Sequence, residues 1–257
     1  MRFSCFTAAA PVGNLEQQCA VIAQSGCAGV ETICFPQQSL ERWQAGLQTV
    51  TNNAGIEVAA VIVGGLALHR ENQDGYVQEA LHAVASLPSA IAVITPQYEA
   101  QAPMPLLPPH PAADPLATQR VRDAFEMIDQ TSARLNLRVC IEPVTQFESQ
   151  FCRTVAGTQV LIEGCRYLRL CLDFHNMNIT ETDIAASIAS AQGLIGHIHV
   201  ADNNRLLPGK GHIGFAPGLQ ALRRINYTGW YSFECAVPGD FEYEVMQATR
   251  YLEDRSK

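Results

Sequence analysis

The chain has 257 residues, of which 47% are apolar and only 16% charged, with 17 basic and 25 acidic side chains. This composition is typical of a soluble globular protein and excludes a disordered or fibrous chain. The formal net charge of −8 argues against a nucleic-acid-binding protein, because neutralising phosphates requires a basic surface.

Strand-like apolar runs alternate along the chain with segments whose apolar residues recur at helical spacing. The predicted strands are residues 2–6, 29–34, 57–63, 91–95, 137–142, 168–173, 195–201 and 230–235. The predicted helical segments are residues 15–22, 40–47, 77–84, 121–135, 158–165, 184–188, 219–222 and 241–252. This alternation predicts parallel strands joined by crossover helices.

Eight such units in a chain of this length favour a closed (β/α)8 TIM barrel, with residues 1–257 forming one domain. The alternative is an open doubly wound sheet. That fold usually carries a G-x-G-x-x-G motif after its first strand, and residues 6–14 contain none. Residues 96–115 contain seven prolines and interrupt the alternation. We interpret this segment as either a surface excursion or a semi-rigid flap over the active site.

The longest apolar run, around residues 56–68, is too short to span a bilayer and contains two glycines. The first residues lack the long apolar stretch of a secretory signal peptide. The nine cysteines include no C-x-x-C pair, so we expect buried thiols in a reducing compartment. The sequence therefore predicts a cytoplasmic protein without a membrane partner.

Charged or coordinating side chains stand at the ends of four consecutive predicted strands. Burying such a group is costly unless it is paired or binds a metal. The separations of 31, 26 and 35 residues each correspond to one βα unit, so the four side chains should meet at the C-terminal mouth of the barrel. The four residues are Glu142, Asp173, His199 and Glu234.

Three carboxylates and one imidazole suit a divalent cation such as Mn²⁺, Mg²⁺, Co²⁺ or Zn²⁺. For any one of these residues alone, the alternative is a buried polar group satisfied by hydrogen bonds. A metal that binds a carbonyl and the adjacent hydroxyl acidifies the neighbouring C–H bond by stabilising the enediolate. If one glutamate removes that proton and the other returns one to the opposite face, the outcome is isomerisation or epimerisation.

Polar loop residues follow two of these strands. Glu148 comes six residues after Glu142, and Arg205 comes six residues after His199. Both are suited to contacting hydroxyl or carbonyl groups of a ligand, although a solvated charge explains Glu148 equally well. Residues 208–212 form a glycine-rich loop with one lysine, which is weak evidence for a phosphate-binding loop.

Residues 141–148, 172–179, 196–212 and 233–234 resemble the xylose isomerase-like TIM-barrel superfamily of sugar isomerases and epimerases. The resemblance is greatest to its ketose 3-epimerase branch, which includes D-tagatose and D-psicose epimerases. It implies that Mn²⁺ or a similar ion is bound by the four strand-end residues. It also implies that Glu142 and Glu234 form the acid/base pair, that Glu148 contacts substrate, and that the partner is a sugar or keto-polyol.

One position departs from the family pattern. Ketose epimerases commonly have a substrate-contacting histidine three residues after the metal aspartate, whereas this chain has Asn176 there and His175 one residue earlier. We expect His175 and Asn176 to contact the substrate together with Glu148 and Arg205. Exposed barrel helices often pair, which leaves a homo-oligomer open.

Three other functions are compatible with a barrel of this kind. A lyase or dehydratase acting on a keto acid or 3-keto-sugar would use the same metal and base but expel a hydroxyl. A DNA-repair enzyme of the endonuclease IV type needs further zinc-binding histidines, but none follows the strand at 91–95 and Asn176 replaces another. A non-catalytic sugar-binding barrel would not need the complete set of metal-binding side chains.

Overall fold

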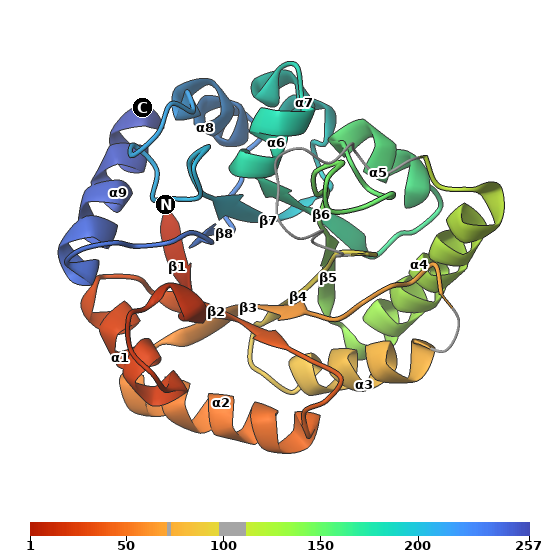
Figure 1. Cartoon of the computed structure of the whole chain (residues 1–257), viewed down its shortest axis with the longest axis horizontal. Coiled ribbons are helices and arrows are strands. Elements are labelled where there is room, and N and C mark those ends of the chain that lie inside the picture. The colour runs from red at the N-terminus through yellow and green to blue at the C-terminus, as the bar shows by residue number, and fades with distance from the viewer. Residues whose placement is uncertain (71–72, 98–111) are drawn as a thin grey trace.

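In the part of the chain that the structure describes, eight parallel strands close into a barrel in the order of the sequence. This computed structural model describes residues 1–70, 73–97 and 112–257. The strands form the inner ring of the molecule and the helices surround them (Figure 1). The (β/α)8 barrel is thus confirmed, and the open doubly wound sheet is wrong. The strands are β1 (Arg2–Phe6), β2 (Gly29–Cys34), β3 (Glu57–Val63), β4 (Ile91–Ile94), β5 (Arg138–Ile141), β6 (Leu168–Asp173), β7 (Ile195–Val200) and β8 (Trp230–Phe233).

Several helices begin at a residue whose side chain accepts a hydrogen bond from a free backbone amide of the first turn. Asn14 caps α1 by accepting a hydrogen bond from the Gln17 amide, and Asp114 caps α4 in the same way, with Pro115 in the first turn. The helices in the described residues are α1 (Leu15–Gln24), α2 (Leu40–Ala54), α3 (Asp74–Ala85), α4 (Pro115–Leu135), α5 (Val155–Leu161), α6 (Phe174–Thr180), α7 (Ile184–Ser190), α8 (Phe215–Arg224) and α9 (Phe241–Arg255), with a short 3-10 helix η1 (Thr7–Ala9).

Among the described residues, α6 is the one α-helix that the apolar pattern does not predict. It follows β6 without an intervening loop, because the last strand residue, Asp173, also caps the helix. The Asp173 Oδ1 atom accepts a hydrogen bond of 2.8 Å from the backbone amide of His175. This cap places Asp173, His175 and Asn176 within one helical turn at the C-terminal end of the barrel.

The barrel interior is apolar in its lower part and polar near its C-terminal end. Side chains of a strand point inward at every second residue. Cys140 on β5 and Cys171 on β6 belong to the apolar interior with Trp230, and Glu142 and Asp173 follow them two residues further on. The polar site therefore rests on a closely packed apolar layer.

Three further expectations concern the cysteines, a membrane-spanning helix and the proline-rich segment. All nine cysteines lie among the described residues and are free, and all except Cys165 are buried. Among the described residues, no helix has the combination of length and apolarity needed to cross a membrane. Most of the proline-rich segment, residues 98–111, lies outside the described residues.

Gly196 offers a test of packing inside the barrel. The strand register shifts between β6 and β7 beside it, and an added Cβ atom would lie 2.5 Å from Cys140 Sγ and 2.9 Å from Arg169 Cβ. We predict that Gly196→Ala lowers the free energy of unfolding by about 1–3 kcal/mol, as measured by urea denaturation. The control is Gly46→Ala on the exposed face of α2, where an added Cβ meets no atom within 4 Å and should stabilise by about 1 kcal/mol. Equal stability of Gly196→Ala and the unmodified chain would contradict this packing.

Candidate active site

The four strand-end side chains that the sequence singles out meet at the C-terminal mouth of the barrel. Asp173 ends β6, His199 lies in β7, and Glu142 and Glu234 come one residue after β5 and β8. One ligand atom from each residue lies within 4.8 Å of the corresponding atoms of the others. The His199 Nδ1 atom is 3.0 Å from Glu142 Oε1 and 3.6 Å from Glu234 Oε2.

The spacing of these atoms fits a divalent cation. An octahedral ion with ligands at about 2.1 Å keeps adjacent ligand atoms about 3.0 Å apart and opposite ones about 4.2 Å apart. The two distances from His199 Nδ1, 3.0 Å to Glu142 and 3.6 Å to Glu234, fall in this range, and all four donor atoms lie within 4.8 Å of one another. Carboxylates combined with one imidazole form a donor set suited to Mn²⁺ and related ions. The residues present therefore fit the group that the resemblance implies.

Because these carboxylates are buried close together, keeping all of them ionised is energetically costly. Glu142 and Asp173 are buried, and the side chain of Glu234 is only 22% exposed. Burial raises the pKa of Glu142, and it raises the pKa of Glu234 to about 8; in each case nearby carboxylates add to the shift and His199 opposes it. Carboxylates held this close together require protons or a cation to be stable, so the site favours binding of positive charge.

Arg205 supplies part of that positive charge. Its NH1 group donates to Asp173 Oδ2 at 2.8 Å and to Glu234 Oε2 at 3.0 Å. Burial alone would lower the pKa of Arg205, but Asp173 and Glu234 outweigh this effect and raise it above its usual value. The residue has a positive φ of 56°, and hydrogen bonds to Asp202 and Ala236 hold its backbone on both sides.

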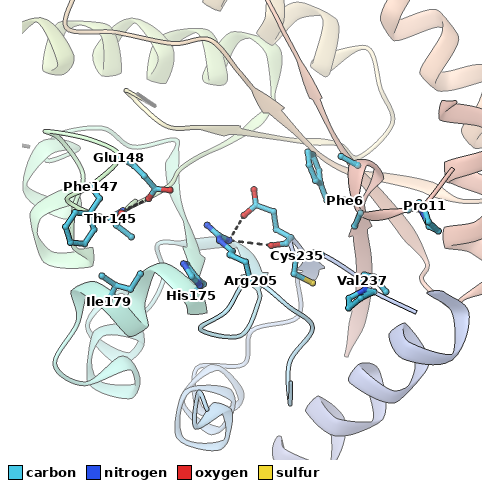
Figure 2. A pocket seen from close by; sticks show the side chains of 16 residues that line it. Phe6, Pro11, Thr145, Phe147, Glu148, His175, Ile179, Arg205, Cys235 and Val237 are labelled. Atoms are coloured by element: carbon cyan, nitrogen blue, oxygen red, sulfur yellow. Dashed lines mark hydrogen bonds and ion pairs between the residues drawn. The ribbon is translucent and has the colours of Figure 1, made fainter. Parts of the chain in front are cut away.

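A cavity of about 920 Å³ opens above the carboxylates at the C-terminal end of the barrel. The polar residues Thr145 and Glu148 lie on one side of it, and the apolar side chains of Phe6 and Val237 lie on the other, with Arg205 between them (Figure 2). The cavity is large enough for a monosaccharide with a substituent. Its walls offer both hydrogen-bonding and apolar contacts.

The structure separates the four proposed substrate-binding residues into two groups. Glu148, His175 and Arg205 line the cavity. Asn176 is buried beneath it, where its Nδ2 atom donates to the Pro143 carbonyl and its Oδ1 atom accepts from Arg205. Since its amide is engaged by the protein on both sides, we assign Asn176 to supporting Arg205 instead of contacting the substrate directly.

His175 lines the cavity, whereas the following residue, Asn176, does not. Its Nδ1 atom lies 3.0 Å from the backbone carbonyl of Asp202. A carbonyl can only accept, so Nδ1 carries a hydrogen, and in the neutral form of the ring Nε2 is the acceptor. On the opposite loop, Glu148 is oriented by hydrogen bonds of 3.0 and 2.7 Å from the amide and hydroxyl of Thr145.

The glycine-rich loop at 208–212 is organised around a carboxylate of the protein. Asp202 accepts hydrogen bonds from the backbone amides of Gly209 and Ile213, as well as from Asn203. Burial opposes ionisation of Asp202, but these amides outweigh it and lower its pKa. Because these amides point at Asp202, the geometry gives no support to the idea of a phosphate-binding loop.

Glu31 is a site residue that the sequence reasoning missed. It lies in the middle of β2, is fully buried, and places its carboxylate 2.8 Å from His199 Nε2 and 3.2 Å from His197 Nε2. The signal was present in the sequence, since Glu31 interrupts an apolar run as the other four residues do. It stands within a strand and not at the strand end, where catalytic side chains of a barrel are expected.

Comparisons with known proteins agree with this architecture. A profile of the family described as "Xylose isomerase-like TIM barrel" matches residues 19–255. The chain belongs to the xylose isomerase-like TIM barrel family. This match covers nearly the whole chain and confirms the resemblance expected from the strand-end motifs.

Relatives of known sequence include sugar epimerases. The chain is 30% identical over 116 residues to 3-dehydro-D-guloside 4-epimerase of Escherichia coli strain K12, covering 44% of each protein. It is 36% identical over 97 residues to D-psicose 3-epimerase of Agrobacterium fabrum strain C58, covering 37% of this chain and 34% of that enzyme. The sequence matches thus span less than half the length of these relatives.

Solved structures of the same kind superpose on almost the entire chain. The apo structure of 3-keto-D-glucoside 4-epimerase from E. coli has a TM-score of 0.84 at 21% identity and covers 99% of both chains. D-allulose 3-epimerase from Methylomonas sp. in complex with D-allulose has a TM-score of 0.83 at 16% identity, covering 99% of this chain and 97% of that one. At such identities the similarity establishes the fold.

Cation binding by the four strand-end residues can be tested at Asp173. We predict that Asp173→Asn weakens Mn²⁺ binding by at least about tenfold, because it removes one ligand charge. Asparagine keeps the oxygen that caps α6, so the fold should survive. Binding is measured from the electron paramagnetic resonance signal of free Mn²⁺. The control, Glu148→Gln, changes a cavity residue outside the set and should bind Mn²⁺ like the unmodified chain; equal binding by Asp173→Asn would exclude Asp173 as a ligand.

Proposed function

We propose that this protein is a divalent-metal-dependent sugar epimerase or isomerase that acts beside the carbonyl of a ketose or related keto-polyol. One observation carries the proposal: Glu142, Asp173, His199 and Glu234 converge beside a sugar-sized cavity, which Glu234 lines. Membership of the xylose isomerase-like family supports it, as does similarity to enzymes named as ketose 3-epimerases and 4-epimerases.

The arrangement of the two glutamates supports proton transfer on both faces of a substrate carbon. Glu142 follows β5 and Glu234 follows β8, so the two carboxylates approach the cavity floor from different sides of the barrel. A divalent cation bound there would stabilise negative charge on the substrate oxygens. One glutamate removes the proton next to the carbonyl, and the other gives a proton to the opposite face. The roles exchange in the reverse reaction.

The charges around the floor favour an uncharged substrate. The three carboxylates of Glu142, Asp173 and Glu234 are balanced by one divalent cation together with the guanidinium of Arg205. Glu148 and the Nε2 atom of His175 would accept hydrogen bonds from sugar hydroxyls, whereas Arg205 would donate to a carbonyl or hydroxyl oxygen. This combination of donors and acceptors suits a polyhydroxylated ligand better than an anionic one.

Among divalent ions, Mn²⁺ is our proposed cofactor, with Mg²⁺, Co²⁺ and Zn²⁺ as alternatives that share the preference for carboxylate and imidazole ligands. The reaction and the ion can be examined together. Metal-stripped protein is reloaded with each ion in turn and incubated with ketoses, 3-keto-glycosides and keto-polyols. The products are analysed by NMR in D₂O, where proton exchange at the reacting carbon replaces hydrogen by deuterium.

The two-glutamate mechanism predicts the behaviour of the amide variants. We expect Glu142→Gln and Glu234→Gln each to lower kcat by about 100- to 10,000-fold, since each variant lacks one acid/base group. Circular dichroism and melting temperature should show that the fold is retained. Glu163→Gln, at an exposed position after α5, is the matched control and should keep full activity.

The product distinguishes the proposed reaction from its alternatives. Epimerisation or isomerisation conserves mass and incorporates solvent deuterium, whereas a dehydratase product lacks one water. Substantial turnover by either glutamine variant would rule out the two-glutamate mechanism even if the unmodified protein were an epimerase.

His175 is predicted to contact the substrate. Loss of one hydrogen bond to a substrate hydroxyl costs about 1–3 kcal/mol, so His175→Ala should lower kcat/KM by about 10- to 100-fold. His175→Gln retains a hydrogen-bonding group and should recover part of this loss. The measurement is steady-state kinetics with the preferred sugar. If His175→Ala has an unchanged kcat/KM, the imidazole does not contact the substrate.

A further inference from the structure

The proposed proton-transfer chemistry makes no use of the buried carboxylate of Glu31. The side chain has no exposed surface and lies on the core side of His199, away from the cavity. Both of its oxygens face imidazoles, because Oε1 is 2.8 Å from His199 Nε2 and Oε2 is 3.2 Å from His197 Nε2. Burying a carboxylate is costly, so this pairing has to be complete for the barrel to tolerate it.

The contact with Glu31 decides which nitrogen of His199 can bind a cation. An ionised carboxylate only accepts hydrogen bonds, so the His199 Nε2 atom must carry the hydrogen. The Nδ1 atom is then the nitrogen with a free electron pair for a metal. This atom is the one that lies 3.0 Å from Glu142 Oε1 and 3.6 Å from Glu234 Oε2. Nδ1 therefore belongs to the candidate cation site.

His197 holds Glu31 in place from its other side. His197 and His199 point inward from the same strand, and their rings meet edge to face at 89° with centroids 5.1 Å apart. Since each imidazole binds a different oxygen of Glu31, rotation of the carboxylate would break both contacts. The orientation of the His199 ring is consequently fixed by β2, a strand that contributes no side chain to the cation site itself.

We infer that Glu31 is a positioning residue, which fixes the tautomer and ring orientation of His199 so that Nδ1 faces the cation. This inference rests on the proposed function only in assuming that a cation binds beside His199, and it does not depend on the identity of the sugar. Such carboxylate partners of metal-binding histidines increase metal affinity by about 10- to 100-fold.

A competing explanation is a second cation bound by Glu31 itself. Glu31, His197 and His199 also offer ligand atoms within 4.8 Å of one another. In that case the chain would bind two ions, and His199 would be shared between them. The number of ions bound per chain therefore distinguishes a positioning residue from a ligand.

The principal test compares Mn²⁺ affinity in Glu31→Gln and a matched control. Glutamine has the same shape and can still accept from His199 while donating to His197, so folding should be preserved; the loss of charge should weaken Mn²⁺ binding by about tenfold or more. The control is Thr32→Val, next to Glu31 on β2. It removes the hydrogen bond between Thr32 and Thr7 of η1 and should bind Mn²⁺ within about twofold of the unmodified chain. Melting temperatures without metal report on folding.

A second measurement reports on the hydrogen of His199 directly. In the Co²⁺-loaded protein, proton NMR should show a hyperfine-shifted, slowly exchanging resonance from the His199 Nε2–H group. This resonance should shift and exchange faster in Glu31→Gln but persist unchanged in Thr32→Val. A purely structural role of Glu31 would lower the melting temperature of the variant without this spectral change.

Three outcomes would overturn the positioning role of Glu31. If Glu31→Gln folds and binds Mn²⁺ as tightly as Thr32→Val, the positioning role is overturned while the proposed metal site stands. Two Mn²⁺ ions per chain, one of them lost in Glu31→Gln, would make Glu31 a ligand and also overturn it. If the unmodified protein binds neither Mn²⁺ nor Co²⁺, the proposed metal site fails and this inference fails with it.

Discussion

Repulsion between carboxylates in a space that excludes most water is the constraint on which the C-terminal half of the barrel depends. Glu142, Asp173 and Glu234 reach one point from three strands, and their mutual repulsion grows as the surroundings become less polar. Arg205 offsets this repulsion from the cavity side, and a cation bound beside the Nδ1 atom of His199 would offset the rest. The strained backbone of Arg205 and the burial of His199 follow from their need to reach these carboxylates.

Along its axis, the barrel interior has an apolar, closely packed part and a polar part that carries the candidate site. Small and branched side chains pack around Trp230 in the lower part, where Gly29 leaves room for the indole ring. The inward-pointing residues two positions further along several strands are polar. Because close packing below resists movement, the side chains above it are held on rigid strands, which is what a site needs when its geometry has to stay fixed without a ligand.

The sequence alone predicted the strands and four of the side chains at their ends, because both depend on short-range patterns: apolar runs and their interruption by charge. Glu31 carries the same signal of a charge within an apolar run, but the sequence could not show which residues it meets, since His197 and His199 lie 166 and 168 residues away and reach it only through barrel closure. Helix α6 was missed because its seven residues carry little apolar periodicity. The burial of Asn176 next to an accessible His175 depends on the direction of that first helical turn.

Asp173 joins two parts of the molecule that are usually separate. One of its oxygens caps α6 and the other faces Arg205 and the candidate cation site. Because the two oxygens of a carboxylate move together, displacement of one oxygen toward a smaller ion would be transmitted to the first turn of the helix. That turn carries His175 into the cavity. Under the proposed function, an ion of different radius would therefore also shift the His175 imidazole, and the choice of metal would affect which pattern of sugar hydroxyls is accepted.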